Sequence, residues 1–126
     1  MNISRVSMYV KNLPLMRDFY ADWFGGRPGD LHEGRPVGVQ HCHVHFENTV
    51  LDLLFNPDMP GDPDSAFRLG LIQFSFSLGT REAVDAKVEA LRQSGFTIYV
   101  EPRVTVSGRY AATILDPETN MVELTE

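Results

Sequence analysis

A tight turn followed by a strand is encoded in one stretch of the chain, Leu115-Asp116-Pro117-Glu118-Thr119-Asn120-Met121-Val122-Glu123-Leu124. Proline fixes φ, and Asp and Asn side chains can hydrogen-bond nearby backbone, so residues 116–120 predict a tight turn. Val122 and Leu124 then alternate with polar residues, which is typical of a half-buried strand. Glu123 is therefore expected on a rigid sheet face, opposite those two apolar side chains, and it is our candidate catalytic residue.

The composition is that of one ordinary soluble domain. The chain has 126 residues, of which 43% are hydrophobic and 22% charged, so it can bury a core without disulfide bonds. A formal charge of -6 argues against a nucleic-acid surface, and we expect a small-molecule partner. Cys42 is a single cysteine, and we find no leader pattern and no membrane-spanning apolar stretch, so we expect a cytoplasmic protein that does not bind a membrane.

The first part of the chain predicts a strand and then a helix. Residues 3–10 alternate in polarity, as a strand with one buried face does. Asn12 is placed to cap the following helix, Pro14 suits its first turn, and Gly25 with Gly26 ends it. Apolar residues at helical spacing predict a face packed on the strand, and these are Met16, Phe19, Tyr20, Trp23 and Phe24.

Two more strands are predicted before the middle of the chain. Residues 27–36 are rich in Gly, Pro and charge, which predicts a loop that reaches a short strand near Val37. Residues 40–46 and 50–55 predict strands joined by a hairpin turn. Asp52 lies alone among the apolar residues of the second of these strands.

The pattern then starts again after a linker. Residues 57–69 carry several prolines and acidic residues and predict no regular element. Residues 71–78 alternate as a strand, and a helix follows with Thr80 as its N-cap and Gly95 at its end. Further strands are predicted at residues 96–100 and 110–115, ahead of the terminal turn.

The two halves therefore repeat one βαβββ pattern with a period of roughly 67 residues. We predict an α+β fold in which two tandem modules, about 1–56 and about 70–126, form one cupped mixed sheet with the helices on its outer face. Both modules belong to a single domain of residues 1–126.

Equivalent positions of the two modules carry polar side chains. Arg5 corresponds to Gln73, Ser7 to Ser75, and Asp52 to Glu123. Because these side chains come from strands of one predicted sheet, we expect them to converge on its concave face.

Several segments also resemble the vicinal oxygen chelate superfamily, which includes glyoxalases, bleomycin-resistance proteins and extradiol dioxygenases. The segments that carry the resemblance are Val10-Lys11-Asn12-Leu13, Phe19-Tyr20, Phe24-Gly25, residues 69–78, and Asp116-Pro117-Glu118-Thr119-Asn120 followed by Glu123. The superfamily usually has Gly where Thr119 stands. The resemblance implies paired βαβββ modules, a small-molecule ligand and, commonly, a homodimer.

The resemblance also implies four metal-binding positions, commonly His, Glu, His and Glu. In this chain they are Arg5, Asp52, Gln73 and Glu123. Asp52, Gln73 and Glu123 offer oxygen atoms, whereas Arg5 only donates hydrogen bonds and cannot bind a cation. An alternative is that the Arg5 guanidinium takes the place of the metal charge and neutralises the carboxylates by forked hydrogen bonds.

Three histidines favour a metal instead. His41, His43 and His45 alternate along one strand, so they share a face, and neighbouring imidazoles can bind one metal. The alternative is that they are polar residues on a solvated or dimer-facing surface. A register slip of one residue would move all of them to the other face.

Two functions follow from these residues. In the first, the protein binds a small organic molecule without the usual metal, and Arg5, Ser7, Tyr9 and Ser75 line the site. In the second, it is a metal-dependent lyase, isomerase or dioxygenase in which Glu123 moves a proton. The candidate ligands for Zn, Ni, Mn or Fe are Asp52, Gln73, Glu123, His43 and His45.

Overall fold

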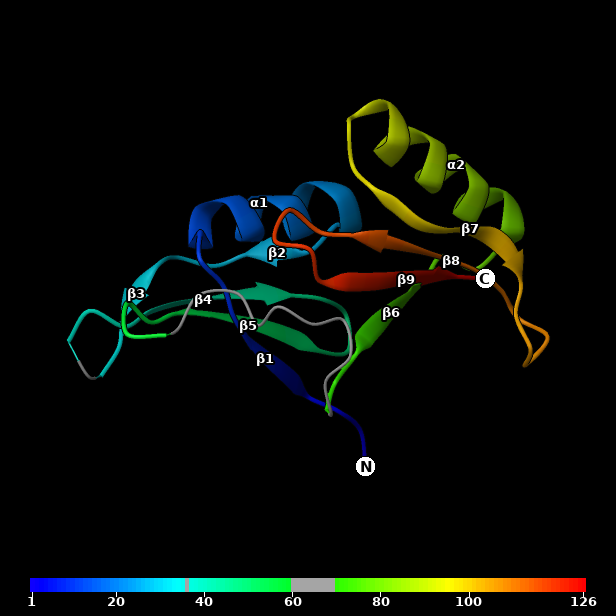
Figure 1. Cartoon of the computed structure of the whole chain (residues 1–126). Helices are drawn as coiled ribbons and strands as arrows, with labels where there is room; N and C mark the ends of the chain where they lie inside the picture. Colours follow the sequence, from blue (N-terminus) through cyan, green and yellow to red (C-terminus); the bar gives the residue numbers. More distant parts are fainter. Residues whose placement is uncertain (36, 60–69) are drawn as a thin grey trace. The chain divides into compact units, whose positions relative to one another are not determined.

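The chain folds into two units, each of which begins with a strand and a helix and continues with further strands (Figure 1). The computed structural model describes residues 1–35, 37–59 and 70–126. The units are Met1–Pro63 and Asp64–Glu126, and each contains one helix and one mixed sheet.

The first unit builds its sheet around a central pair of strands. Its elements are β1 (Arg5–Tyr9), α1 (Leu13–Phe24), β2 (Arg27–Pro28), β3 (His32–Glu33), β4 (Gln40–His45) and β5 (Val50–Phe55). The strand order is β1-β5-β4-β2, and β3 also pairs with β4. The pair β1 and β5 is parallel and the other pairs are antiparallel.

The second unit repeats this arrangement. Its elements are β6 (Gln73–Ser77), α2 (Arg81–Gln93), β7 (Ile98–Val104), β8 (Tyr110–Leu115) and β9 (Met121–Thr125), with the strand order β6-β9-β8-β7. Again the first strand of the unit is parallel to the last, β6 to β9, and the rest are antiparallel. The predicted α+β fold with mixed sheets is confirmed.

Both helices begin and end at the residues that the sequence indicates. Asn12 Oδ1 accepts a hydrogen bond from the Leu15 amide at 3.0 Å, and Thr80 Oγ1 accepts one from the Ala83 amide at 3.1 Å. These caps satisfy backbone donors that the first helical turn leaves free. Gly25 ends α1 at a φ of 70°, a left-handed conformation that glycine adopts without steric cost.

Each helix covers one face of the sheet in its own unit. The aromatic stripe of α1 packs on β4 and β5, with Met16, Phe19 and Tyr20 buried. On the facing side of β4, Cys42 and Val44 are fully buried. In the second unit Val84, Val88 and Leu91 form the buried stripe of α2, as predicted. The other face of each sheet is thus free to carry polar residues.

The terminal turn is closed by the side chain of Asp116. Its Oδ1 accepts hydrogen bonds from the backbone amides of Glu118 and Asn120, each at 2.9 Å. The Asn120 side-chain amide donates to both Asp116 oxygens. Thr119 lies in the left-handed region with a φ of 68°, which explains why a glycine suits this position. The predicted tight turn is confirmed.

The predicted loop at residues 27–36 needs correction. It contains the short strands β2 and β3, and Val37 lies in an exposed turn and in no strand. Two-residue strands show no periodicity, so the sequence could not indicate them. Pro36 and residues 60–69 of the predicted linker lie outside the described part of the chain.

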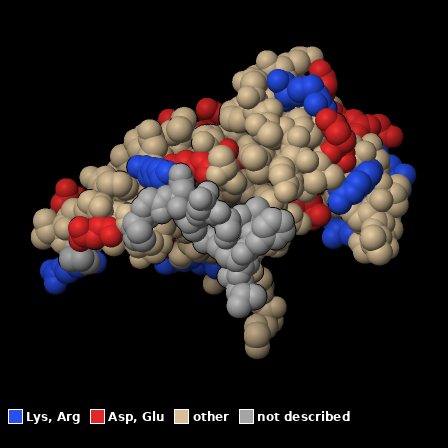
Figure 2. Space-filling model, viewed as in Figure 1, with Lys and Arg blue, Asp and Glu red and all other residues tan. Residues whose placement is uncertain are grey.

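Acidic and basic side chains intermingle on the face drawn in Figure 2. Within the described residues, neither α1 nor α2 is long and apolar enough to cross a membrane.

Candidate functional site

The polar face of the first sheet gathers residues from three neighbouring strands. The register places Ser7 of β1 and His43 of β4 on either side of Asp52 of β5. Cys42 and Val44 face α1, so the alternating histidines of β4 lie on the opposite face, as predicted for this register. Arg5 and Tyr9 share the Ser7 side of β1.

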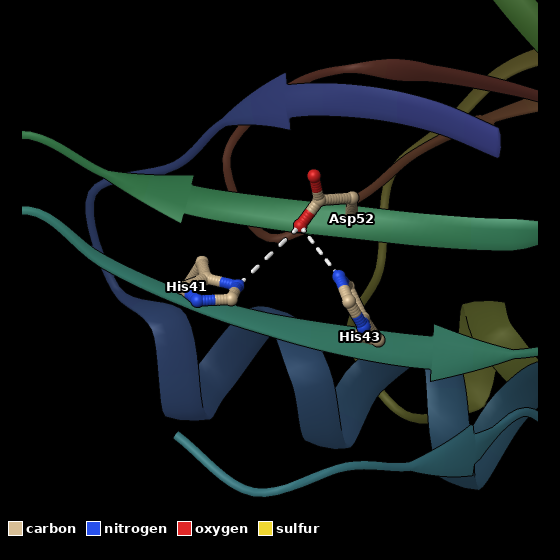
Figure 3. Close-up of side chains that lie close together, drawn as sticks. All are labelled: His41, His43 and Asp52. Atoms are coloured by element: carbon tan, nitrogen blue, oxygen red, sulfur yellow. Dashed lines mark ion pairs between the residues drawn. The ribbon is translucent and has the colours of Figure 1, made fainter. Parts of the chain in front are cut away.

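Asp52 is the centre of this face. It is only 8% exposed, and its Oδ2 accepts a hydrogen bond from Ser7 Oγ at 3.1 Å. Its other oxygen, Oδ1, is buried and accepts no hydrogen bond from the described part of the chain. Figure 3 shows the side chains of His41 and His43 turned toward Oδ1, with His43 Nε2 at 3.3 Å and His41 Nδ1 at 4.0 Å. A buried acceptor without a hydrogen bond is costly, so Oδ1 marks a place where a cation would be stabilised.

The imidazoles continue along the sheet on both sides of this centre. Ring centroids are 5.5 Å apart for His32 and His41, 5.5 Å for His41 and His43, and 5.8 Å for His43 and His45. Burial lowers the pKa of His43 from its usual 6.5; the nearby Asp52 opposes the shift, and the charge of Arg5 adds to it. The shift favours the neutral form of the His43 ring, which is the form that binds metals.

Three of these side chains together could hold a metal ion. Each of His41, His43 and Asp52 offers one donor atom, and the three atoms lie within 4.8 Å of one another. The sequence predicted His43 and Asp52 as metal ligands, and it placed His41 on their face without selecting it. His45, which was selected, lies beyond His43 and outside this group of described residues.

A hollow adjoins the same polar face. It has a volume of about 210 Å³ and is lined by Ser7, Met8, Tyr9 and Leu54. Leu54 is paired with His41 across β4 and β5, so the hollow borders the histidine and aspartate cluster. Two of the predicted ligand-binding residues, Ser7 and Tyr9, thus line one hollow.

The second unit has an equivalent serine and carboxylate pair but, among the described residues, no histidines beside it. Ser75 Oγ donates a hydrogen bond to Glu123 Oε2, as Ser7 does to Asp52. The residue beside Glu123 on β8 is Thr113, where β4 has His43. Gln73 lies two residues before Ser75 on β6, beside Met121.

Cys42 has no place in the site. It is fully buried on the face of the sheet that α1 covers, and burial raises the pKa of its thiol. A buried thiol of raised pKa is a poor nucleophile, so Cys42 acts as a small apolar residue of the core, as predicted.

The sequence matches the model of one known protein family. The sequence model of the Glyoxalase/Bleomycin resistance protein/Dioxygenase superfamily matches residues 2–124. The chain belongs to this superfamily. The predicted resemblance is confirmed over nearly the whole chain, and members of the superfamily bind small molecules.

Solved structures of the superfamily share the fold. A glyoxalase family protein from Enterococcus faecalis is 21% identical, with a TM-score of 0.81 over 99% of this chain and 97% of its own. A glyoxylase/bleomycin resistance protein/dioxygenase domain from Frankia sp. EAN1pec is 17% identical, with a TM-score of 0.84 over 99% and 96%. Lactoylglutathione lyase from Agrobacterium tumefaciens is 20% identical, with a TM-score of 0.68 over 99% and 92%. The sequence has no match among curated proteins.

The metal site that is usual in the superfamily does not fit this chain. The resemblance implies that its four positions are Arg5, Asp52, Gln73 and Glu123, and an arginine carries no lone pair for a cation. Within the described residues, the side-chain nitrogens near Asp52 Oδ1 are those of His43, at 3.3 Å, and His41, at 4.0 Å. The groups that the structure places beside this oxygen are therefore imidazoles of the same unit, and the guanidinium of Arg5 is not among them.

Sequence reasoning missed His41 and His32 as neighbours of the site. Alternation showed that His41 shares the face of His43, but it could not show that His41 leans toward Asp52 across a diagonal of the sheet. His32 lies on β3 and pairs with His41, in a segment predicted as loop. A histidine opposite another histidine on a short strand leaves no signal in the sequence pattern.

Proposed function

We propose that the protein binds a small organic molecule on the polar face of its first unit, without the four-position metal site that is usual in the superfamily. The observation that carries this proposal is the hollow of about 210 Å³ beside Ser7, Tyr9 and Leu54. The volume of this hollow is below the roughly 300–1,000 Å³ of sites for drug-sized ligands, which favours a ligand with few heavy atoms.

The charge of the surrounding side chains indicates the class of guest. Arg5 lies on the same side of β1 as Ser7 and Tyr9, and its positive charge acts at His43. A guanidinium recognises carboxylates and carbonyl oxygens by forked hydrogen bonds. We therefore expect a small carboxylate or 2-oxo acid, with the Tyr9 ring as an apolar wall. Ser75, which the sequence also predicted to bind ligand, lies on β6 of the second unit and is not part of this proposed site.

The binding proposal is tested with a panel of small carboxylates and 2-oxo acids, observed by saturation-transfer NMR. Binding to the wild type and loss of binding in Tyr9→Ala and Arg5→Ala are the expected result. Tyr99→Ala is the matched control, because Tyr99 is 53% exposed and Tyr9 is 54% exposed, yet Tyr99 lies outside the hollow. Equal losses in Tyr9→Ala and Tyr99→Ala would contradict the proposed site.

A second candidate function is favoured by the histidine and aspartate cluster. A metal-dependent lyase, isomerase or dioxygenase would use a divalent ion to bind oxygen atoms of its substrate. Glu123, which the sequence predicted to move a proton, lies in the second unit and accepts a hydrogen bond from Ser75, so its catalytic role stays a prediction. Turnover that appears only with added Zn, Ni, Mn or Fe and is lost in Asp52→Asn would favour this candidate.

We also propose that the protein forms a homodimer and is located in the cytoplasm. Light scattering of the purified protein measures the first, and cell fractionation measures the second.

A further inference from the structure

We propose that His41, His43 and Asp52 form a metal site for one divalent transition ion of the zinc or ferrous class, built entirely within the first unit. The site differs from the usual site of the superfamily in three respects: its ligands, its use of adjacent strands and its independence from the second unit. It does not require the hollow to hold an organic molecule.

The donor set selects the class of ion. Two imidazoles with one carboxylate suit zinc and non-haem iron, whereas calcium and magnesium prefer sites made of oxygen atoms alone. Three protein ligands also leave coordination positions open, as in metal sites that bind a water molecule or a substrate. The hollow lined by Ser7 and Tyr9 borders the cluster and leaves room for such a molecule.

The distances fit a site that needs only small side-chain movements. Zinc bonds of about 2.0–2.1 Å in a tetrahedron put neighbouring ligand atoms about 3.3 Å apart. His43 Nε2 and Asp52 Oδ1 are 3.3 Å apart, and His41 Nδ1 lies 4.0 Å from the same oxygen. The largest separation in the group is 4.8 Å, which rotation of the half-exposed His41 ring can shorten.

Asp52 is oriented for this role by a neighbour. Ser7 holds Oδ2 by a hydrogen bond, which leaves the buried Oδ1 directed at both imidazoles without a hydrogen bond in the described chain. Carboxylates that bind metals are commonly fixed by such a bond to their other oxygen. Ser7 is therefore a positioning residue of the site.

A simple ion pair explains less of this arrangement. An ion pair needs only one of the two imidazoles, and it does not explain why the second also lies within 4.0 Å of the same oxygen. A shared cation gives both rings and Oδ1 a favourable partner at once.

The test is a zinc titration of the full chain, without an affinity tag, after removal of metals with EDTA and dialysis. Isothermal titration calorimetry is expected to show one zinc per chain. His41→Ala, His43→Ala and Asp52→Asn should each weaken binding by more than about 100-fold, because loss of a neighbour that only supports a ligand costs about 10–100-fold. Cobalt(II) in place of zinc should give a visible absorption band that these variants lose.

His45→Ala is the matched control, since His45 shares the strand and the face but lies outside the group. It should keep the zinc affinity of the wild type. Ser7→Ala should weaken zinc binding about 10–100-fold, and Ser7→Thr, which keeps the hydroxyl, should restore it. Circular dichroism checks folding, and His43→Gln replaces His43→Ala if the alanine variant unfolds.

The outcomes are distinct. Zinc binding that survives Asp52→Asn, or that falls equally in His45→Ala, would overturn the site and leave nonspecific binding to surface imidazoles. Failure of the carboxylate panel with intact zinc binding would reject the proposed function and keep this metal site.

Discussion

The two units carry the same serine and carboxylate pair, yet only the first surrounds its carboxylate with imidazoles. Ser7 donates to Asp52 in one unit, and Ser75 donates to Glu123 in the other. On the strand next to the carboxylate, β4 places His43 beside Asp52, whereas β8 places Thr113 beside Glu123.

The residue two places before His43 on β4 also differs from its equivalent on β8. His41 lies opposite the residue two places after Asp52, and the corresponding residue of β8 is Ala111. The repeated fold thus supplies a held carboxylate twice, and two side chains of one strand decide whether that carboxylate lies in a cluster of metal ligands. The candidate metal ligands therefore all belong to the first unit, whereas the usual site of the superfamily takes its ligands from both modules.

The carboxylates of the two units should differ most in their effect on zinc affinity. Asp52→Asn should lower zinc affinity by more than about 100-fold, whereas Glu123→Gln should leave it unchanged, because Thr113 and Ala111 offer no imidazole. Calorimetry on both variants under identical conditions measures the difference. Equal losses in the two variants would favour a site that uses both carboxylates.

The units also differ in how they enter their last strand. Asp116 closes the turn of the second unit with hydrogen bonds to the Glu118 and Asn120 amides, so Asp116→Ala should destabilise the protein by about 2–3 kcal/mol. Glu47→Ala, in the exposed turn of the first unit, should change stability by less than about 0.5 kcal/mol. Urea denaturation followed by circular dichroism measures both. Similar midpoints for the two variants would contradict the role of Asp116.

Thr119 in the same turn gives a smaller effect of opposite sign. A side chain at a φ of 68° is strained, and Thr119→Gly should therefore stabilise the protein by about 0.5–1 kcal/mol. Thr119→Ala keeps a Cβ at this backbone angle and should gain less. A glycine variant that melts below the wild type would show that the threonine side chain makes a contact that outweighs the strain.

The smallest effect concerns the helices. The helix α1 packs on its sheet with Phe19 and Tyr20 buried, whereas α2 adds a forked ion pair from Arg92 to Glu101, with bonds of 2.9 and 2.7 Å. The hydrogen bond to Arg92 lowers the folded-state pKa of Glu101 below 4.5. The pair therefore stabilises the fold above pH 4.5, and this contribution is lost as the pH falls through the folded pKa.

Glu101→Gln should remove that part of the acid dependence and change stability little, because the pair is exposed and screened by solvent. Melting temperatures at a series of pH values down to 3 measure it, with Glu89→Gln as the control for the longer Arg92 contact of 3.3 Å. A wild-type acid dependence that persists in Glu101→Gln would show that this ion pair does not contribute to it.

The sequence predicted the parts of the fold that depend on local chemistry. Asn12, Gly25 and Thr80 mark helix ends because caps are properties of single residues. Alternation placed the histidines of β4 and Asp52 on strands, since the period of a strand is visible in its own residues. The short strands β2 and β3 were not predictable, because each is defined only by its pairing with β4.

The candidate site was predictable only in part, for a related reason. His43 and Asp52 were expected as ligands, and the register confirms that they are direct neighbours. The choice between His41 and His45 as the third ligand depends on side-chain direction and on diagonal distance, which the alternation of polarity does not contain. For Arg5 the sequence alone was sufficient, because an arginine side chain cannot bind a metal ion at the usual position.

Diffraction from crystals of the zinc-loaded protein, recorded on both sides of the zinc absorption edge, locates the bound ion. We predict one anomalous peak about 2.0–2.2 Å from a ring nitrogen of His41, a ring nitrogen of His43 and Oδ1 of Asp52. A peak bonded to Gln73 or Glu123, or zinc-loaded crystals without a peak at Asp52, would contradict a metal site built within the first unit.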